Sequence, residues 1–61
     1  MTEEEKKKEY YKRVDDFVQA ANHEKIMSNK HCENKDHPEL VGAVAAVKHT
    51  LKRLSAIADQ L

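Results

Sequence analysis

Four side chains that can bind zinc lie in the middle of this 61-residue chain: His23, His31, Cys32 and His37. Imidazole nitrogen and thiolate sulfur are suitable ligands for zinc. Adjacent residues rarely both reach one ion, however, and His31 directly precedes Cys32. The chain also has no Cys-x-x-Cys pair, which is the commonest signature of a zinc site. The pattern therefore favours solvated loop histidines and predicts no cofactor, with a small zinc-binding protein as the first alternative.

The sequence predicts no enzyme, because three catalytic patterns are incomplete. A carboxylate-bridged di-iron bundle needs Glu-x-x-His, and no glutamate has a histidine three residues later. His23-Glu24 begins like a zinc-protease helix, but Met27 stands where the second histidine belongs. Cys32 lies in a short polar segment that suggests neither an oxyanion hole nor a substrate pocket.

Contact with nucleic acid is a second alternative. Lys48, Lys52 and Arg53 form a small basic group on a predicted helix, opposite its apolar stripe. A charged outer face is also what any amphipathic helix in water requires. The chain holds 11 basic and 11 acidic residues, without the basic excess of a typical nucleic-acid-binding domain. A nucleic-acid partner is therefore not favoured.

The first element that positions these groups is a predicted helix over residues 3–29. Thr2 and Glu5 have the spacing of a capping box. An apolar stripe then repeats at intervals of three and four residues, as Tyr10, Val14, Phe17 and Ala21, with Tyr11 and Val18 beside it. Ile26 points well away from this stripe. We therefore expect either a bend near residues 22–23 or a contact of Ile26 with something outside the chain's own fold.

The second predicted helix covers residues 37–61 and follows a polar loop over residues 30–36. Asp36 and Glu39 suggest another capping box, with Pro38 in the first turn. The apolar residues then keep a period of 3.5 residues over three heptads. They are Leu40, Val44, Val47, Leu51, Leu54, Ala58 and Leu61. Gly42 costs about 1 kcal/mol of helix propensity relative to alanine, which predicts close packing at that position.

The fold class that follows is all-α: a single antiparallel two-helix hairpin, pairing into a four-helix bundle. A chain of this size usually needs a disulfide, a metal or a partner subunit to fold stably. One cysteine cannot form an intrachain disulfide and favours a reducing, cytoplasmic setting. No segment resembles a signal peptide or a membrane span.

Association is therefore the expected source of stability, and the predicted function is a small protein-interaction module. Its expected partner is a second copy of itself in a homodimer or higher oligomer, or another protein. The expected interface consists of Tyr10, Val14, Phe17, Ile26, Leu40, Val44, Val47, Leu51, Leu54 and Leu61.

Overall fold

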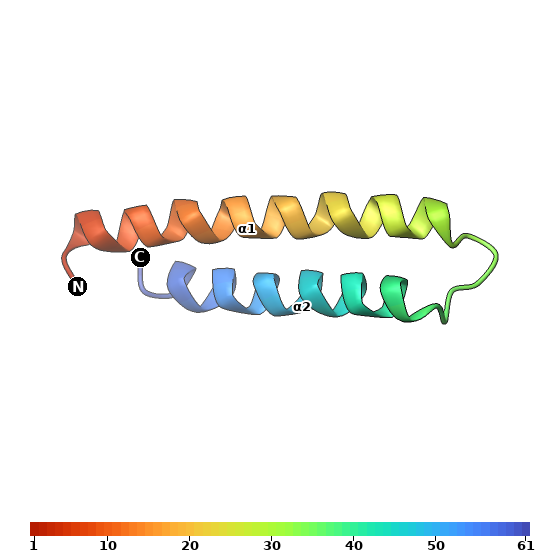
Figure 1. Cartoon of the computed structure of the whole chain (residues 1–61). Coiled ribbons are helices and arrows are strands. Elements are labelled where there is room, and N and C mark those ends of the chain that lie inside the picture. The colour runs from red at the N-terminus through yellow and green to blue at the C-terminus, as the bar shows by residue number, and fades with distance from the viewer.

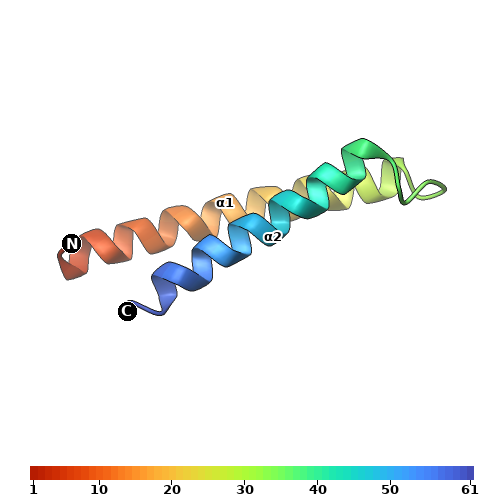
Figure 2. The ribbon, with the colours of Figure 1, turned by 90° about the horizontal axis from the view of Figure 1, so that it is seen from below.

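The computed structural model describes all 61 residues and contains two long helices. Helix α1 runs over Glu3–Lys30 and helix α2 over Pro38–Ala58. They lie antiparallel along a rod of 47 × 14 × 11 Å, with both chain termini at the end away from the turn (Figure 1). Seen from below, the helices cross at a shallow angle (Figure 2). The predicted all-α helical hairpin is confirmed.

Helix α1 begins with the capping box that the sequence predicts. The Thr2 hydroxyl accepts a hydrogen bond from the Glu5 amide at 3.2 Å, and the Thr2 amide donates to the Glu5 carboxylate at 3.4 Å. These bonds satisfy backbone donors that have no partner within the first turn. Glu3, Glu4 and Glu5 also place negative charge at the positive end of the helix dipole.

Helix α1 continues without interruption through residues 22–23 and ends one residue later than expected, at Lys30. The ribbon shows no kink there (Figure 1). His31 caps the helix, and its amide donates to the Met27 carbonyl at 2.9 Å. The expected bend is therefore absent, and the Ile26 side chain is left 60% exposed.

The start of α2 differs from the sequence expectation in the residue that caps it. His37, not Asp36, is the N-cap, and its Nδ1 accepts a hydrogen bond from the Glu39 amide at 3.2 Å. Pro38 then occupies the first helical position, where its missing N–H costs nothing. Asp36 lies in the preceding turn and donates its amide to the Asn34 side chain at 3.2 Å.

At its other end, α2 stops at Ala58, short of the expected residue 61. The Gln60 and Leu61 amides donate to carbonyls three residues earlier, at 3.0 and 3.1 Å. Such bonds are typical of the tightened turn that ends a helix. Leu61 therefore lies beyond the helix and is exposed.

The face that α2 turns toward α1 overlaps the predicted heptad only in part. Leu40, Ala43 and Ile57 are the buried residues of the whole chain. Half-buried Val47, Thr50 and Leu54 complete a row spaced by three and four residues. Ala43 and Ile57 do not belong to the predicted heptad, yet they are more deeply buried than their neighbours Val44 and Ala58, which do belong to it. Leu51 remains 48% exposed, because the helix is rotated so that Thr50 faces α1 more directly.

The facing side of α1 is mixed in character and contains no fully buried residue. Its half-buried positions include Tyr10, Arg13, Phe17, Ala20, Glu24, Met27 and His31. The two helices therefore share a narrow seam and not a broad core. Gly42 lies on the exposed side of α2, and a Cβ there would meet no atom within 4 Å. The close packing expected at Gly42 is absent within the hairpin.

Candidate functional site

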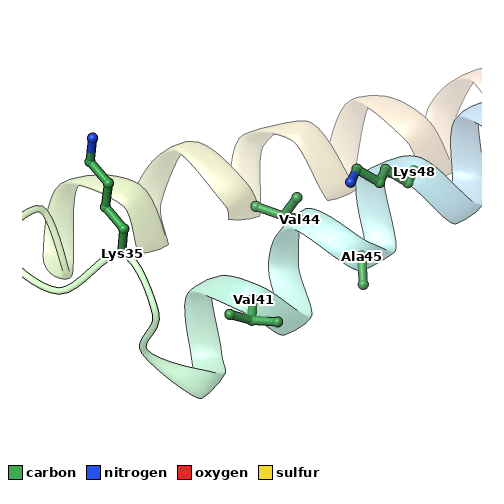
Figure 3. A pocket seen from close by; sticks show the side chains of 5 residues that line it. All are labelled: Lys35, Val41, Val44, Ala45 and Lys48. Carbon is green, nitrogen blue, oxygen red and sulfur yellow. The ribbon is translucent and has the colours of Figure 1, made fainter.

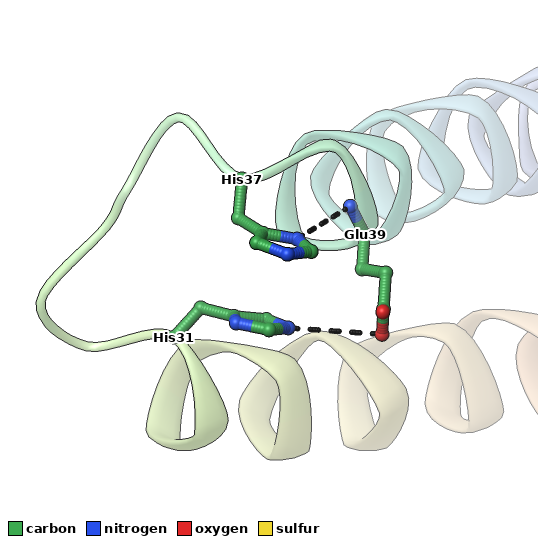
Figure 4. Close-up of side chains that lie close together, drawn as sticks. All are labelled: His31, His37 and Glu39. Carbon is green, nitrogen blue, oxygen red and sulfur yellow. Dashed lines mark hydrogen bonds and ion pairs between the residues drawn. The ribbon is translucent and has the colours of Figure 1, made fainter.

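Two histidine rings stack at the turn end of the hairpin. The ring centroids of His31 and His37 are 3.7 Å apart, with 8° between the ring planes (Figure 4). His31 is the residue that caps the end of α1, and His37 is the residue that caps the start of α2. The hairpin turn between them therefore brings the two imidazoles face to face.

Glu39 adds a carboxylate to the two rings. Its Oε2 lies 3.7 Å from Nε2 of His31 and 3.6 Å from Nζ of Lys30. The positive charge of Lys30 is the main cause that holds the pKa of the Glu39 carboxyl below its ordinary value, and His31 acts in the same direction. The carboxylate is thus ionised at neutral pH. One ligand atom from each of His31, His37 and Glu39 lies within 4.8 Å of the other two.

The Nε2 atom of His31 is the exceptional polar atom of this cluster. It is buried from solvent and has no hydrogen-bond partner. Glu39 is its nearest carboxylate, but 3.7 Å is beyond hydrogen-bond distance. Buried polar atoms are usually satisfied, so an unpaired ring nitrogen indicates a place for a water molecule, a proton-mediated pair or an ion.

The structure brings two of the four sequence-predicted metal ligands together and leaves out the other two. His23 is exposed along α1, and Cys32 is an exposed free thiol in the turn. Glu39 is a candidate ligand that the sequence did not predict. A signal for the pair was present, because the five residues between His31 and His37 match the separation of many zinc-binding histidine pairs. The prediction that the spacing of these ligands is poor overlooked this pair.

A second feature is an apolar strip that neither helix covers. Beside α2, an open hollow is lined by Lys35 of the turn and by Val41, Val44, Ala45 and Lys48 of the helix (Figure 3). Val41 is 52% exposed, and Leu51 extends the strip further along the same helix. On α1, Tyr11 and Val18 are exposed next to half-buried Val14 and Ala21.

Helix geometry places these two groups on the same side of the hairpin. At about 100° per residue, each group is centred roughly 100° further round its helix than the residues that face the partner helix. The two helices run in opposite directions, so the same sense of rotation turns both groups toward one side. We call this surface the open face. It consists of Tyr11, Val14, Val18 and Ala21 of α1 and Val41, Val44 and Leu51 of α2.

Eight of the ten predicted interface residues divide between the two surfaces, and exposed Ile26 and Leu61 belong to neither. Tyr10, Phe17, Leu40, Val47 and Leu54 pack in the seam between α1 and α2, where they are buried or half-buried. Val14, Val44 and Leu51 belong to the open face. Ile26 lies about 100° of helix rotation from the centre of the open face and belongs to neither surface.

The residues of the predicted basic group are exposed, but they do not form one continuous basic surface. Lys48, Lys52 and Arg53 all face solvent. Lys48 lines the apolar hollow, and Arg53 projects from a different side of α2 than Lys52, because consecutive residues are about 100° apart. The backbone oxygen of Arg53 accepts a hydrogen bond from Nη1 of Arg13 of α1 at 2.8 Å.

Comparison with protein families, curated proteins and solved structures finds no match to this chain. Neither α1 nor α2 combines the length and apolar content that a membrane-spanning helix needs.

Proposed function

We propose that this chain is a non-enzymatic association module that pairs with a second copy of itself through the open face. Two hairpins joined in this way form a four-helix bundle, which buries the strip that each hairpin leaves uncovered. The bundle would then act as a small subunit or adaptor for other proteins. The surface area of the hairpin is the observation that carries this proposal.

The hairpin exposes 4734 Å² for a mass of 7.0 kDa. A compact monomer of that mass exposes about 4,000 Å², so the excess is roughly 700 Å². A stable interface of standard size removes about 800 Å² from each partner. One hairpin therefore carries an excess of surface close to the amount that one dimer interface covers.

The position of the open face favours a second copy as its occupant. A two-fold axis brings the same patch of both subunits together, so the apolar residues of this patch can pack on their own copies. The patch runs along both helices, which allows side-by-side packing over much of the rod. The narrow seam inside each hairpin, with three buried residues, leaves much of the stability to be supplied by this association.

Sedimentation velocity of the full chain in the presence of a metal chelator tests the proposal. We expect a dimer at micromolar concentration, and a melting temperature that rises with protein concentration. A folded monomer with a cooperative, concentration-independent melt would contradict it. A stable complex with another protein but no self-association would show that the open face serves a different partner.

The variant Leu51→Asp, with Ile26→Asp as its matched control, identifies the surface. Leu51 lies on the open face and Ile26 outside it, although both are large exposed apolar residues. Fully burying such a side chain contributes about 1.5–3 kcal/mol, and about half of that remains for Leu51, which is 48% exposed. Losing two per dimer should therefore weaken association at least roughly 10-fold. The control should leave it nearly unchanged. Equal effects of the two variants would refute the assignment of the open face.

A further inference from the structure

We propose that the turn end of the hairpin binds a divalent transition-metal ion of the zinc type through His31, His37 and Glu39. This site is separate from the open face, and the inference does not depend on dimer formation. The imidazole and carboxylate groups are suitable zinc ligands, and three protein ligands leave a fourth position for water.

The distances are close to those that one ion requires. Zinc binds nitrogen and oxygen at about 2.0–2.2 Å, so two ligand atoms of one ion are separated by at most about 4.2–4.4 Å. The three ligand atoms of the cluster lie within 4.8 Å of one another. The remaining gap is short, but closing it requires the side chains to rotate. The two rings must tilt from their parallel stack, so that the nitrogen lone pairs point toward a common centre.

The unpaired Nε2 of His31 is the second observation, and it is independent of the spacing. A neutral imidazole with a buried Nε2 and no partner leaves an atom that has lost its contact with water and gained nothing. A bound ion would provide the missing partner. Glu39 lies beside this nitrogen, since its Oε2 is the nearest acidic oxygen to Nε2 of His31.

Two existing contacts must break when the ion binds: the ion pair of Lys30 with Glu39 and the hydrogen bond that His37 accepts at the start of α2. Lys30 lies 3.6 Å from the Glu39 carboxylate, but its side chain is 58% exposed and can turn into solvent. His37 uses Nδ1 to accept the Glu39 amide, so its neutral ring carries the proton on Nε2. Binding through Nε2 moves this proton to Nδ1 and releases the cap hydrogen bond. The freed Glu39 amide is exposed and can bond to water.

The bound ion would join the end of α1 directly to the start of α2. The three ligands lie on both sides of the turn, so the ion binds the folded hairpin more tightly than the extended chain. Binding of this kind raises the free energy of unfolding in proportion to the logarithm of the ratio of ion concentration to Kd, once that ratio is large. At a hundredfold excess over Kd, we expect the melting temperature to rise on the order of 10 °C.

Calorimetric titration of the full chain with Zn²⁺ provides the test, with Co²⁺ absorption spectra as a second readout. We expect one ion per chain. His31→Gln and His37→Asn should each reduce affinity by more than the roughly 10–100-fold cost of removing an outer-sphere partner. Asparagine is a good N-cap residue, so His37→Asn keeps the start of α2 while removing the imidazole. Circular dichroism verifies that both variants remain helical.

The matched controls are His23→Gln, His49→Gln and Cys32→Ser, which change exposed residues outside the cluster. They should leave affinity unchanged, and the Co²⁺ spectrum should contain no thiolate band. Lys30→Gln should raise affinity, because it removes the competing charge. The proposal is overturned if the chain binds no Zn²⁺, if His31→Gln and His37→Asn bind it as well as the parent chain, or if Cys32→Ser abolishes binding. Since sedimentation in chelator tests the dimer alone, the two proposals fail independently.

Discussion

The guanidinium of Arg13 donates a hydrogen bond from Nη1 to the backbone oxygen of Arg53, 2.8 Å away on the facing helix. Its Nε donates to Glu9 Oε1 at 2.9 Å, so one side chain connects both helices and its own helical neighbour. The contact lies far from the turn, where the chain itself imposes little constraint on the pairing. Arg13 therefore helps to set the register of α1 against α2.

Replacing Arg13 with methionine removes both hydrogen bonds and keeps an apolar stem of similar length. We expect a loss of about 1 kcal/mol in the free energy of unfolding, since the bonds are only partly shielded from water. Urea denaturation followed by circular dichroism measures the change. Lys12→Met is the control, because Lys12 is an exposed neighbour. Equal stabilities of the two variants would show that the bridge does not contribute.

Acid should destabilise the hairpin partly through Glu9. The hydrogen bond from Arg13 is the main cause that lowers the pKa of the Glu9 carboxyl below its ordinary value of 4.5. Lowering of the folded-state pKa means that the stabilisation is present above pH 4.5 and is lost as the pH falls through the folded value. Glu39 shifts in the same direction.

Melting temperatures recorded in chelator from pH 6 to pH 3 test this prediction. The parent chain should lose stability as the pH falls below about 4.5, and Glu9→Gln should show a smaller loss over the same interval. A profile for Glu9→Gln that runs parallel to that of the parent chain would rule out a role for Glu9.

Gly42→Ala should stabilise the protein. The added methyl group meets no atom, and alanine is favoured over glycine within a helix by about 1 kcal/mol. For a domain of this size, the melting temperature should rise by roughly 4–8 °C. The reverse change at an exposed alanine of the same helix, Ala46→Gly, should lower it by a similar amount. A destabilising Gly42→Ala would mean that another molecule packs closely on this side of α2.

Ile57→Ala and Leu51→Ala should separate the stability of the hairpin from that of the dimer. Ile57 is only 2% exposed, and truncating a buried isoleucine costs about 2–5 kcal/mol. Its effect should persist at every protein concentration. Leu51→Ala should matter only where dimers form. Melts over a hundredfold range of concentration distinguish the two, and concentration-independent loss in Leu51→Ala would place Leu51 in the hairpin seam.

The hairpin was predictable because its signals are local. Thr2 and Glu5 mark one helix start by themselves, and the polar stretch between the two apolar stripes marks the turn. The rotation of α2 was not predictable in the same way. Leu40, Val47 and Leu54 suit either of two neighbouring rows, and the choice between Thr50 and Leu51 depends on how α1 packs. A single chain's periodicity does not carry that information.

The candidate site was half predictable for a related reason. His31 and His37 were identifiable by residue type, but Glu39 becomes a neighbour only when α2 begins at Pro38. Asp36 looked like the better cap because aspartate is a common N-cap residue. The turn instead uses Asp36 to bond Asn34 and leaves the cap to His37. The carboxylate beside the two rings is therefore that of Glu39, in the first turn of α2.

Side-chain contacts join α1 to α2 near both ends of the rod. Arg13 bonds to Arg53 toward the termini, and the histidine cluster lies at the turn. The stretch of α1 between Arg13 and His31 spans about 27 Å of helix. This stretch sets the separation of the two contacts. Inserting or deleting a heptad in both helices together would change the rod length by about 10 Å and restore each apolar face to its former orientation. The length of the rod, and with it the separation of its two ends, could thus vary without any change to the contacts at either end.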